Sequence, residues 1–136
     1  MPNFTVNFLA VLIAALAAMF IGMFWYSNTL FAKTWMAAIG KTEEEIKKGT
    51  TGPIYVINTV ANLVLAYVLA LAVRYAGAVS AIDGAKVGIW VWLGFVVTTL
   101  LPVYLFEMRP IKVYFIYIAY QLISFIVMGI ILTLWV

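Results

Sequence analysis

Apolar side chains dominate the chain in four long stretches, and short segments between them hold nearly all of the charged positions. The stretches cover residues 4–26, 54–73, 87–106 and 113–136. Each is close to the roughly 20 residues that an α-helix needs to cross the hydrocarbon core of a bilayer. None has the polar face that a helix on the outside of a soluble bundle requires. The pattern therefore predicts an all-α protein, a four-transmembrane-helix bundle that forms a single domain over residues 1–136.

The one long predicted connection, residues 27–52, carries two short helical patterns. Apolar residues in its first part recur at helical spacing: Leu30, Phe31, Trp35 and Ile39. Such a helix would lie in the membrane interface. In the second part, Thr42 and Glu45 have the spacing of a capping box, which marks the start of another short helix. We therefore expect a helical loop, interfacial or cytoplasmic, between the first and second spans.

Small residues repeat every four positions along the first span, which places them on one helix face: Ala10, Ala14, Ala18 and Gly22. In lipid, small residues let two helix backbones approach closely, so that van der Waals packing replaces the missing hydrophobic drive. Two interpretations of this ladder follow. It packs the first helix against its own bundle, or it forms an interface between copies of the chain.

Polar side chains inside the spans form two stripes. The second span carries Asn58 and Asn62, and the fourth carries Tyr117, Gln121 and Ser124. Polar groups are costly in a bilayer, so both stripes are expected to face the interior of the bundle. The two spans run in the same direction, which makes Asn62 the nearest in depth to Gln121. The stripes are interpreted either as hydrogen-bonding partners that hold the helices together or as the lining of a binding site or polar pathway.

Composition narrows the chemistry further. Charged residues make up 10% of the chain, against about 25% in soluble domains. The chain has no Cys and no His, which removes the usual metal ligands, thiol nucleophiles and proton shuttles. Its few basic residues are scattered and do not form the patch that nucleic-acid binding requires. We therefore expect no enzyme activity, no catalytic residue, no metal site, no cofactor and no nucleic-acid partner.

Basic residues are distributed unequally between the two ends of the predicted bundle. The connections after the first and third spans hold Lys33, Lys41, Lys47, Lys48, Arg109 and Lys112, whereas the opposite side holds only Arg74 and Lys86. Lys and Arg are enriched in cytoplasmic loops. This bias predicts a multi-pass protein of the cell membrane with loops 1 and 3 in the cytoplasm and both termini outside.

Short motifs in both halves of the chain carry a family resemblance: Gly22 with Trp25-Tyr26, and Phe106-Glu107-Met108-Arg109. On these motifs the chain resembles a family of small membrane proteins catalogued as domain of unknown function seventeen sixty-one. The resemblance implies a four-span membrane protein over nearly the whole chain and carries over no known activity. It also marks Trp25, Tyr26, Glu107 and Arg109 as positions worth testing.

Two functional hypotheses follow from these patterns. The first is a non-enzymatic protein, in contact with membrane lipid, that works by association. It would be an accessory subunit of a larger membrane complex or a homo-oligomer built on the small-residue ladder of the first span. The alternative is a small carrier or channel for an uncharged or amphipathic solute. Its pathway would be lined by the polar stripes of the second and fourth spans: Asn58, Asn62, Tyr117 and Gln121.

Overall fold

The computed structural model describes residues 5–135, and helices account for most of them. In chain order the elements are α1 (Phe8–Trp25), α2 (Ala32–Ile39), α3 (Glu43–Gly49), α4 (Gly52–Tyr75), α5 (Ala81–Trp92), the π-helical turn η1 (Leu93–Val97), α6 (Thr98–Phe106) and α7 (Ile111–Leu134). The described residues contain no strand. This confirms the predicted all-α fold.

Four helices are long and apolar enough to cross a membrane: α1, α4, the continuous helix formed by α5, η1 and α6, and α7. The third span begins at Ala81 rather than at residue 87, because Ser80 and Asp83 form a capping box there. Thr42 and Glu45 form a second capping box at the start of α3, as their spacing predicts. The predicted outer limits at residues 4 and 136 lie outside the described residues.

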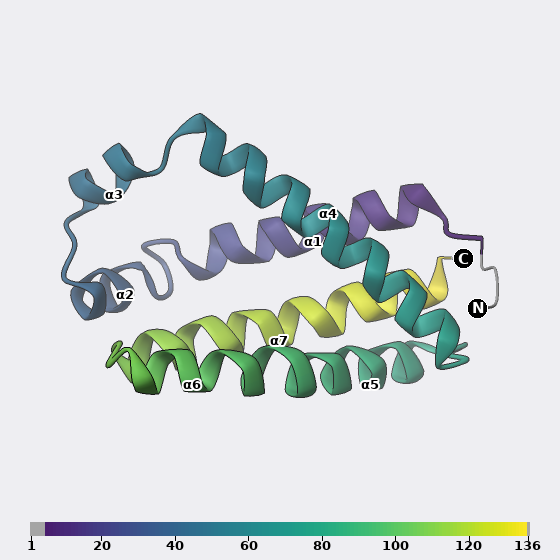
Figure 1. Ribbon diagram of the computed structural model, residues 1–136. Coiled ribbons are helices and arrows are strands. Elements are labelled where there is room, and N and C mark those ends of the chain that lie inside the picture. The colour runs from purple at the N-terminus through teal and green to yellow at the C-terminus, as the bar shows by residue number, and fades with distance from the viewer. Residues whose placement is uncertain (1–4, 136) are drawn as a thin grey trace.

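The four spans run up and down through the bundle, each antiparallel to the one before it (Figure 1). The start of α1, the end of α7 and the α4–α5 connection share one end. Helices α2 and α3 and the α6–α7 turn share the other end, which we call the loop end. Helix α7 packs against α1, α4, α5 and α2, so it is the central helix of the bundle.

Three glycines bring the backbones of α5 and α7 into direct contact. A Cβ atom on Gly84 would collide with the carbonyl oxygen of Gly129, and one on Gly88 would collide with the carbonyl oxygen of Phe125. The reverse also holds, since a Cβ atom on Gly129 would collide with the carbonyl oxygen of Gly84. Only glycine lets the two helices approach this closely, and close approach is what van der Waals packing in lipid rewards.

The small-residue ladder of α1 packs inside the same bundle. Ala10, Ala14 and Ala18 are each at most 1% exposed and belong to a core with residues of α4 and α7. Gly22 faces Tyr120 of α7, whose hydroxyl oxygen would lie 3.0 Å from a Cβ atom on that glycine. The first interpretation of the ladder therefore describes the structure. The second interpretation, an interface between copies on this face, does not fit these buried alanines, so a homo-oligomer would have to use another surface.

Aromatic side chains form hydrogen bonds between the third span and α7, near the π-helical turn of the third span. The π-helical turn η1 ends at Val97, and Pro102, which has no N–H group, follows inside α6. The hydroxyl of Tyr114 donates a hydrogen bond of 2.8 Å to the carbonyl of Val97. In addition, the indole Nε1 of Trp92 donates one of 2.8 Å to the carbonyl of Ile118.

Replacing Gly88 with Ala tests the α5–α7 contact. The added methyl group must push the two backbones apart, so the Gly88→Ala variant is expected to lose roughly 1–3 kcal/mol of stability. Thermal unfolding in detergent, followed by circular dichroism, measures the change. The matched control is Gly94→Ala, because nothing lies within 4 Å of a Cβ atom at Gly94 in η1. Equal unfolding temperatures for the two variants would contradict the contact.

Candidate functional site

Helices α4 and α7 form the two walls of a half-open cavity of about 230 Å³. Their chains diverge toward the loop end, and α4 crosses the bundle at an angle (Figure 1). The buried residues of α4 accordingly begin at Asn62, whereas residues 52–58 are all exposed. The cavity lies where the helices separate, and its walls are formed by Asn58, Ala61, Asn62, Leu65, Tyr117, Tyr120 and Gln121.

Residues from both predicted polar stripes line this cavity, but each stripe is hydrogen-bonded along its own helix. On α4, Asn62 Nδ2 donates to the carbonyl oxygen of Asn58 at 2.8 Å and to Asn58 Oδ1 at 3.2 Å. On α7, Gln121 Nε2 donates to the hydroxyl of Tyr117 at 2.7 Å. No side-chain hydrogen bond joins the two stripes among residues 5–135. Of the two interpretations, bonding between the stripes is not found among these residues, and a shared lining describes the arrangement.

These local bonds leave hydrogen-bonding capacity on both walls. Asn58 Nδ2 and the hydroxyl of Tyr117 remain as donors, and Asn62 Oδ1 and Gln121 Oε1 remain as acceptors, since no other described residue pairs with these atoms. No charged side chain lines the cavity. Donors and acceptors at membrane depth without partners are costly unless water or a ligand satisfies them.

Ser124, which the spacing on α7 assigned to the same stripe, does not line the cavity. Its side chain is completely buried, 0% exposed, in the packed part of the bundle. Position 124 lies beyond the point where α4 and α7 come together. This is a correction to the sequence interpretation, because helical spacing identifies a shared face but not the point along it where a cavity ends.

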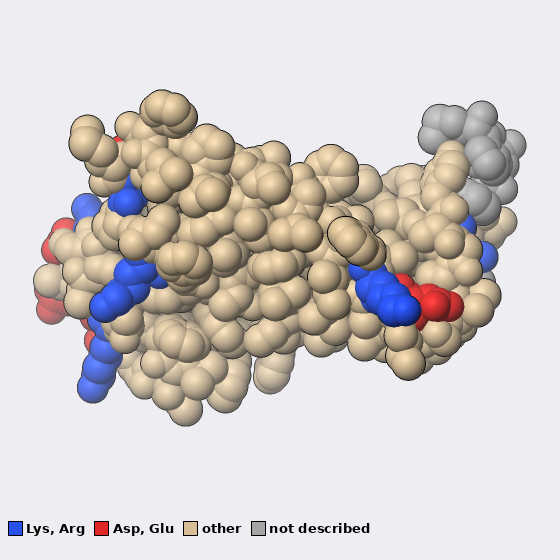
Figure 2. Space-filling model, turned by 90° about the horizontal axis from the view of Figure 1, so that it is seen from below, with Lys and Arg blue, Asp and Glu red and all other residues tan. Residues whose placement is uncertain are grey.

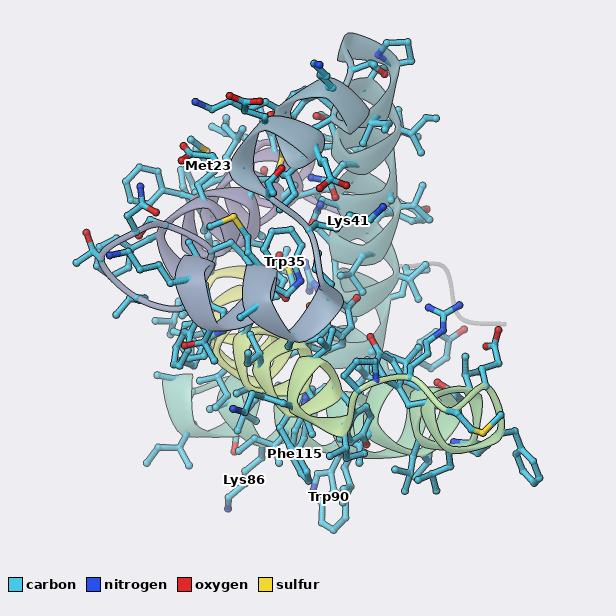
Figure 3. All side chains as sticks on the ribbon, turned by 90° about the vertical axis from the view of Figure 1, so that its left-hand side faces the viewer. Met23, Trp35, Lys41, Lys86, Trp90 and Phe115 are labelled. Carbon is cyan, nitrogen blue, oxygen red and sulfur yellow. The ribbon has the colours of Figure 1, made fainter. Side chains whose placement is uncertain are left out.

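A row of aromatic rings connects α2 to the α7 wall of the cavity. Helix α2 lies in front of the ends of α1 and α7 when the bundle is viewed from the loop end, and it carries Trp35 (Figure 3). The Trp35 ring packs edge-on against the Tyr26 ring, with 5.0 Å between the ring centroids. The Tyr26 ring packs against the Tyr120 ring, with 6.0 Å between the centroids. Tyr120 in turn packs against Tyr117 at 6.1 Å. In the sequence, Tyr120 lies beside the polar stripe of α7. No pattern in the sequence connects α2 with this site.

None of the four residues marked by the family resemblance lines the cavity, although Tyr26 packs against its wall residue Tyr120. Trp25 Nε1 donates to the carbonyl oxygen of Ile116 at 3.0 Å, which ties the end of α1 to α7. Glu107 and Arg109 form an exposed ion pair of 3.4 Å within the α6–α7 turn. Exposed pairs of this kind contribute little to stability.

An uncharged belt separates two charged ends on the face shown in Figure 2. Together with the four long apolar helices, this belt defines the class: a multi-pass membrane protein. Within the described part of the chain, no group of His, Cys, Asp or Glu side chains could hold a metal ion.

The chain belongs to the family described as Protein of unknown function (DUF1761), which matches residues 9–133. This confirms the resemblance and covers all four spans. No curated protein and no solved structure matches the chain significantly.

Single cysteines can test whether the cavity is wet, because the chain has no cysteine of its own. A water-soluble methanethiosulfonate reagent attacks the thiolate, whose formation lipid suppresses. Asn58→Cys should therefore react roughly tenfold or more faster than Val64→Cys, since each unit by which lipid raises a thiol pKa lowers the thiolate fraction about tenfold. Val64 is a suitable control because it lies on the same helix and is 58% exposed on its outer surface. Mass spectrometry measures the rate at which each variant is labelled. Similar rates for the two variants would show that the cavity does not admit water.

Proposed function

We propose that this membrane protein binds an uncharged or amphipathic small molecule in the α4–α7 cavity and acts as a carrier or channel for it, without catalysing a reaction. The observation that carries this proposal is the set of unused donors and acceptors on two facing helices, on Asn58 and Asn62 of one and Tyr117 and Gln121 of the other. A volume of about 230 Å³ leaves room for several waters or one small organic molecule.

The chemistry of the wall restricts the solute. An ion entering the cavity would leave water without meeting an opposite charge, and that desolvation is unfavourable. A neutral hydroxyl, amide or carbonyl compound can use amide and phenol groups from both walls at once. The apolar members of the wall, Ala61 and Leu65, suit the hydrocarbon part of such a compound.

The splay of α4 supports entry at the loop end. Ile54, Tyr55 and Ile57, in the first two turns of α4, are 47%, 61% and 67% exposed, so this part of the helix does not seal against its neighbours. A solute could therefore reach Asn58 from the side before it reaches Asn62 and Gln121, which lie deeper. This arrangement suits a solute that partitions into the membrane surface first.

Replacing Asn62 and Gln121 together with Leu tests the proposal. The double variant should lose roughly tenfold in binding or flux, since membrane hydrogen bonds are worth about 0.6 kcal/mol each on average and up to about 1.7 kcal/mol. Native mass spectrometry of gently extracted protein identifies the bound molecule, and flux of that molecule into liposomes measures transport.

Thr98→Val and Thr99→Val together provide the control for the double variant. Both hydroxyls donate to backbone carbonyls of their own helix, and neither residue lines the cavity. This control should keep the activity of the original chain. Undiminished flux through the Asn62→Leu, Gln121→Leu variant would overturn the assignment of the cavity.

Association remains the second candidate function, and one observation favours it. The first half of α4 is apolar and exposed on several sides, including Val56 at 63% and Val60 at 54%. A partner helix or a second copy could cover this surface, whereas the ladder on α1 is already occupied. The mass of the extracted particle distinguishes the two candidates, because a carrier can be a monomer with a bound small molecule and an association protein cannot.

We also propose that the loop end lies in the cytoplasm and that both termini lie outside. The support is the bias of six basic residues at the loop end against two at the other, among eight in all. Lys41→Cys and Val79→Cys place single thiols on exposed residues at opposite ends. With a membrane-impermeant reagent on intact cells, only the Val79→Cys variant should be labelled. Labelling of Lys41→Cys alone would reverse the orientation.

A further inference from the structure

Three apolar grooves follow one another along the seam between α1 and α7. The first, of about 510 Å³, lies between α2, the end of α1 and the start of α7. It shares Trp25 with a second groove of about 360 Å³, and the second shares Phe20 and Ile21 with a third of about 550 Å³. We call this continuous surface the α1–α7 furrow. It is distinct from the α4–α7 cavity, since no residue lines both.

The furrow has a polar end and an apolar remainder. Lys112 and Thr34 line it at the loop end, and every other lining residue is apolar. Along α7 it follows one helix face: Lys112, Ile116, Ala119, Ile123 and Val127. At 1.5 Å per residue, the distance from the first to the last of these is about 22 Å. One leaflet is about 15 Å deep, half of a hydrocarbon core of about 30 Å. The furrow is therefore long enough for a complete acyl chain.

The wall of the furrow is fixed in place before any ligand arrives. The indole of Trp25 is held by its hydrogen bond to the carbonyl of Ile116, and its ring lies 4.7 Å from that of Phe31. A preformed groove binds more tightly than one whose side chains must first be ordered.

The charge at the polar end indicates the headgroup. Lys112 and Thr34 are both exposed, and within the described part of the chain neither side chain forms an ion pair or a hydrogen bond. Lys112 also lies at the end that holds six of the eight basic residues. Basic groups between helices at the membrane surface are suited to anionic lipid headgroups.

We propose that the α1–α7 furrow is a binding site for one anionic glycerophospholipid. Lys112 and Thr34 bind its phosphate, and one acyl chain lies along the furrow past Phe115 and Ala119 toward Phe20. The bound lipid spans the seam between the end of α1, α2 and α7, which makes it part of the wall of the bundle. This site does not depend on the proposed function of the α4–α7 cavity.

The test compares phosphatidylglycerol with phosphatidylcholine of identical acyl chains, each offered to the full-length protein in mixed detergent micelles. Native mass spectrometry counts the lipid molecules retained by each protein particle. We expect one phosphatidylglycerol to be retained in preference to phosphatidylcholine, by roughly fivefold, the effect of about one lysine near a membrane surface. Equal retention of the two lipids would overturn the proposal.

Two variants and a control locate the lipid. Lys112→Gln should abolish the preference for phosphatidylglycerol, whereas Lys86→Gln, near the start of α5 at the opposite end of the bundle, should keep it. Ala119→Phe, which fills the furrow, should reduce retention of both lipids. An unchanged preference in Lys112→Gln, or an equal loss in Lys86→Gln, would show that general charge rather than this furrow binds the lipid.

Discussion

The direct backbone contact between α5 and α7 is the constraint on which the rest of this bundle depends. In lipid there is no hydrophobic gain from bringing two apolar helices together, so their association relies on close packing and a few hydrogen bonds. Gly84, Gly88 and Gly129 allow the close packing. The hydrogen bonds are those from Trp92 and Tyr114 to backbone carbonyls. The third span and α7 thus form a rigid pair, against which α1 packs its ladder of small residues.

Helix α7 presents three sides to its neighbours, and each side has a different chemistry. The side of Phe125 and Gly129 meets the glycines of α5. The side of Lys112 and Ala119 forms the furrow with α1 and α2. The side that carries Gln121 is polar and faces α4 across a space. A helix that is apolar nearly all round by composition is therefore specialised by a few small, polar or basic positions along its faces.

Much of this architecture could be predicted from the sequence, because length and polarity decide where a helix crosses a bilayer. The four spans, the capping box of Thr42 and Glu45 and the close approach allowed by small residues belong to this class of information. The tilt of α4 does not, since periodicity identifies the face of a helix but not its crossing angle. For the same reason the sequence left open whether the polar stripes bond to each other or line a site, and the structure shows Asn62 reaching back to Asn58 beside a cavity. The role of Trp35 also depends on the fold of a loop whose position no local pattern specifies.

Helix α4 is buried in the bundle only from Asn62 onward, so its first part can act as a lever arm. Its buried residues begin at Asn62, so about ten residues, or about 15 Å of helix, project beyond the fulcrum. Over that arm, a rotation of about 10° moves the free tip by about 3 Å, which is the diameter of a water molecule. The width of the cavity thus depends on the tilt of α4 relative to α7. Packing around Ala66, Leu69 and Val73, in the buried second half of α4, holds this tilt.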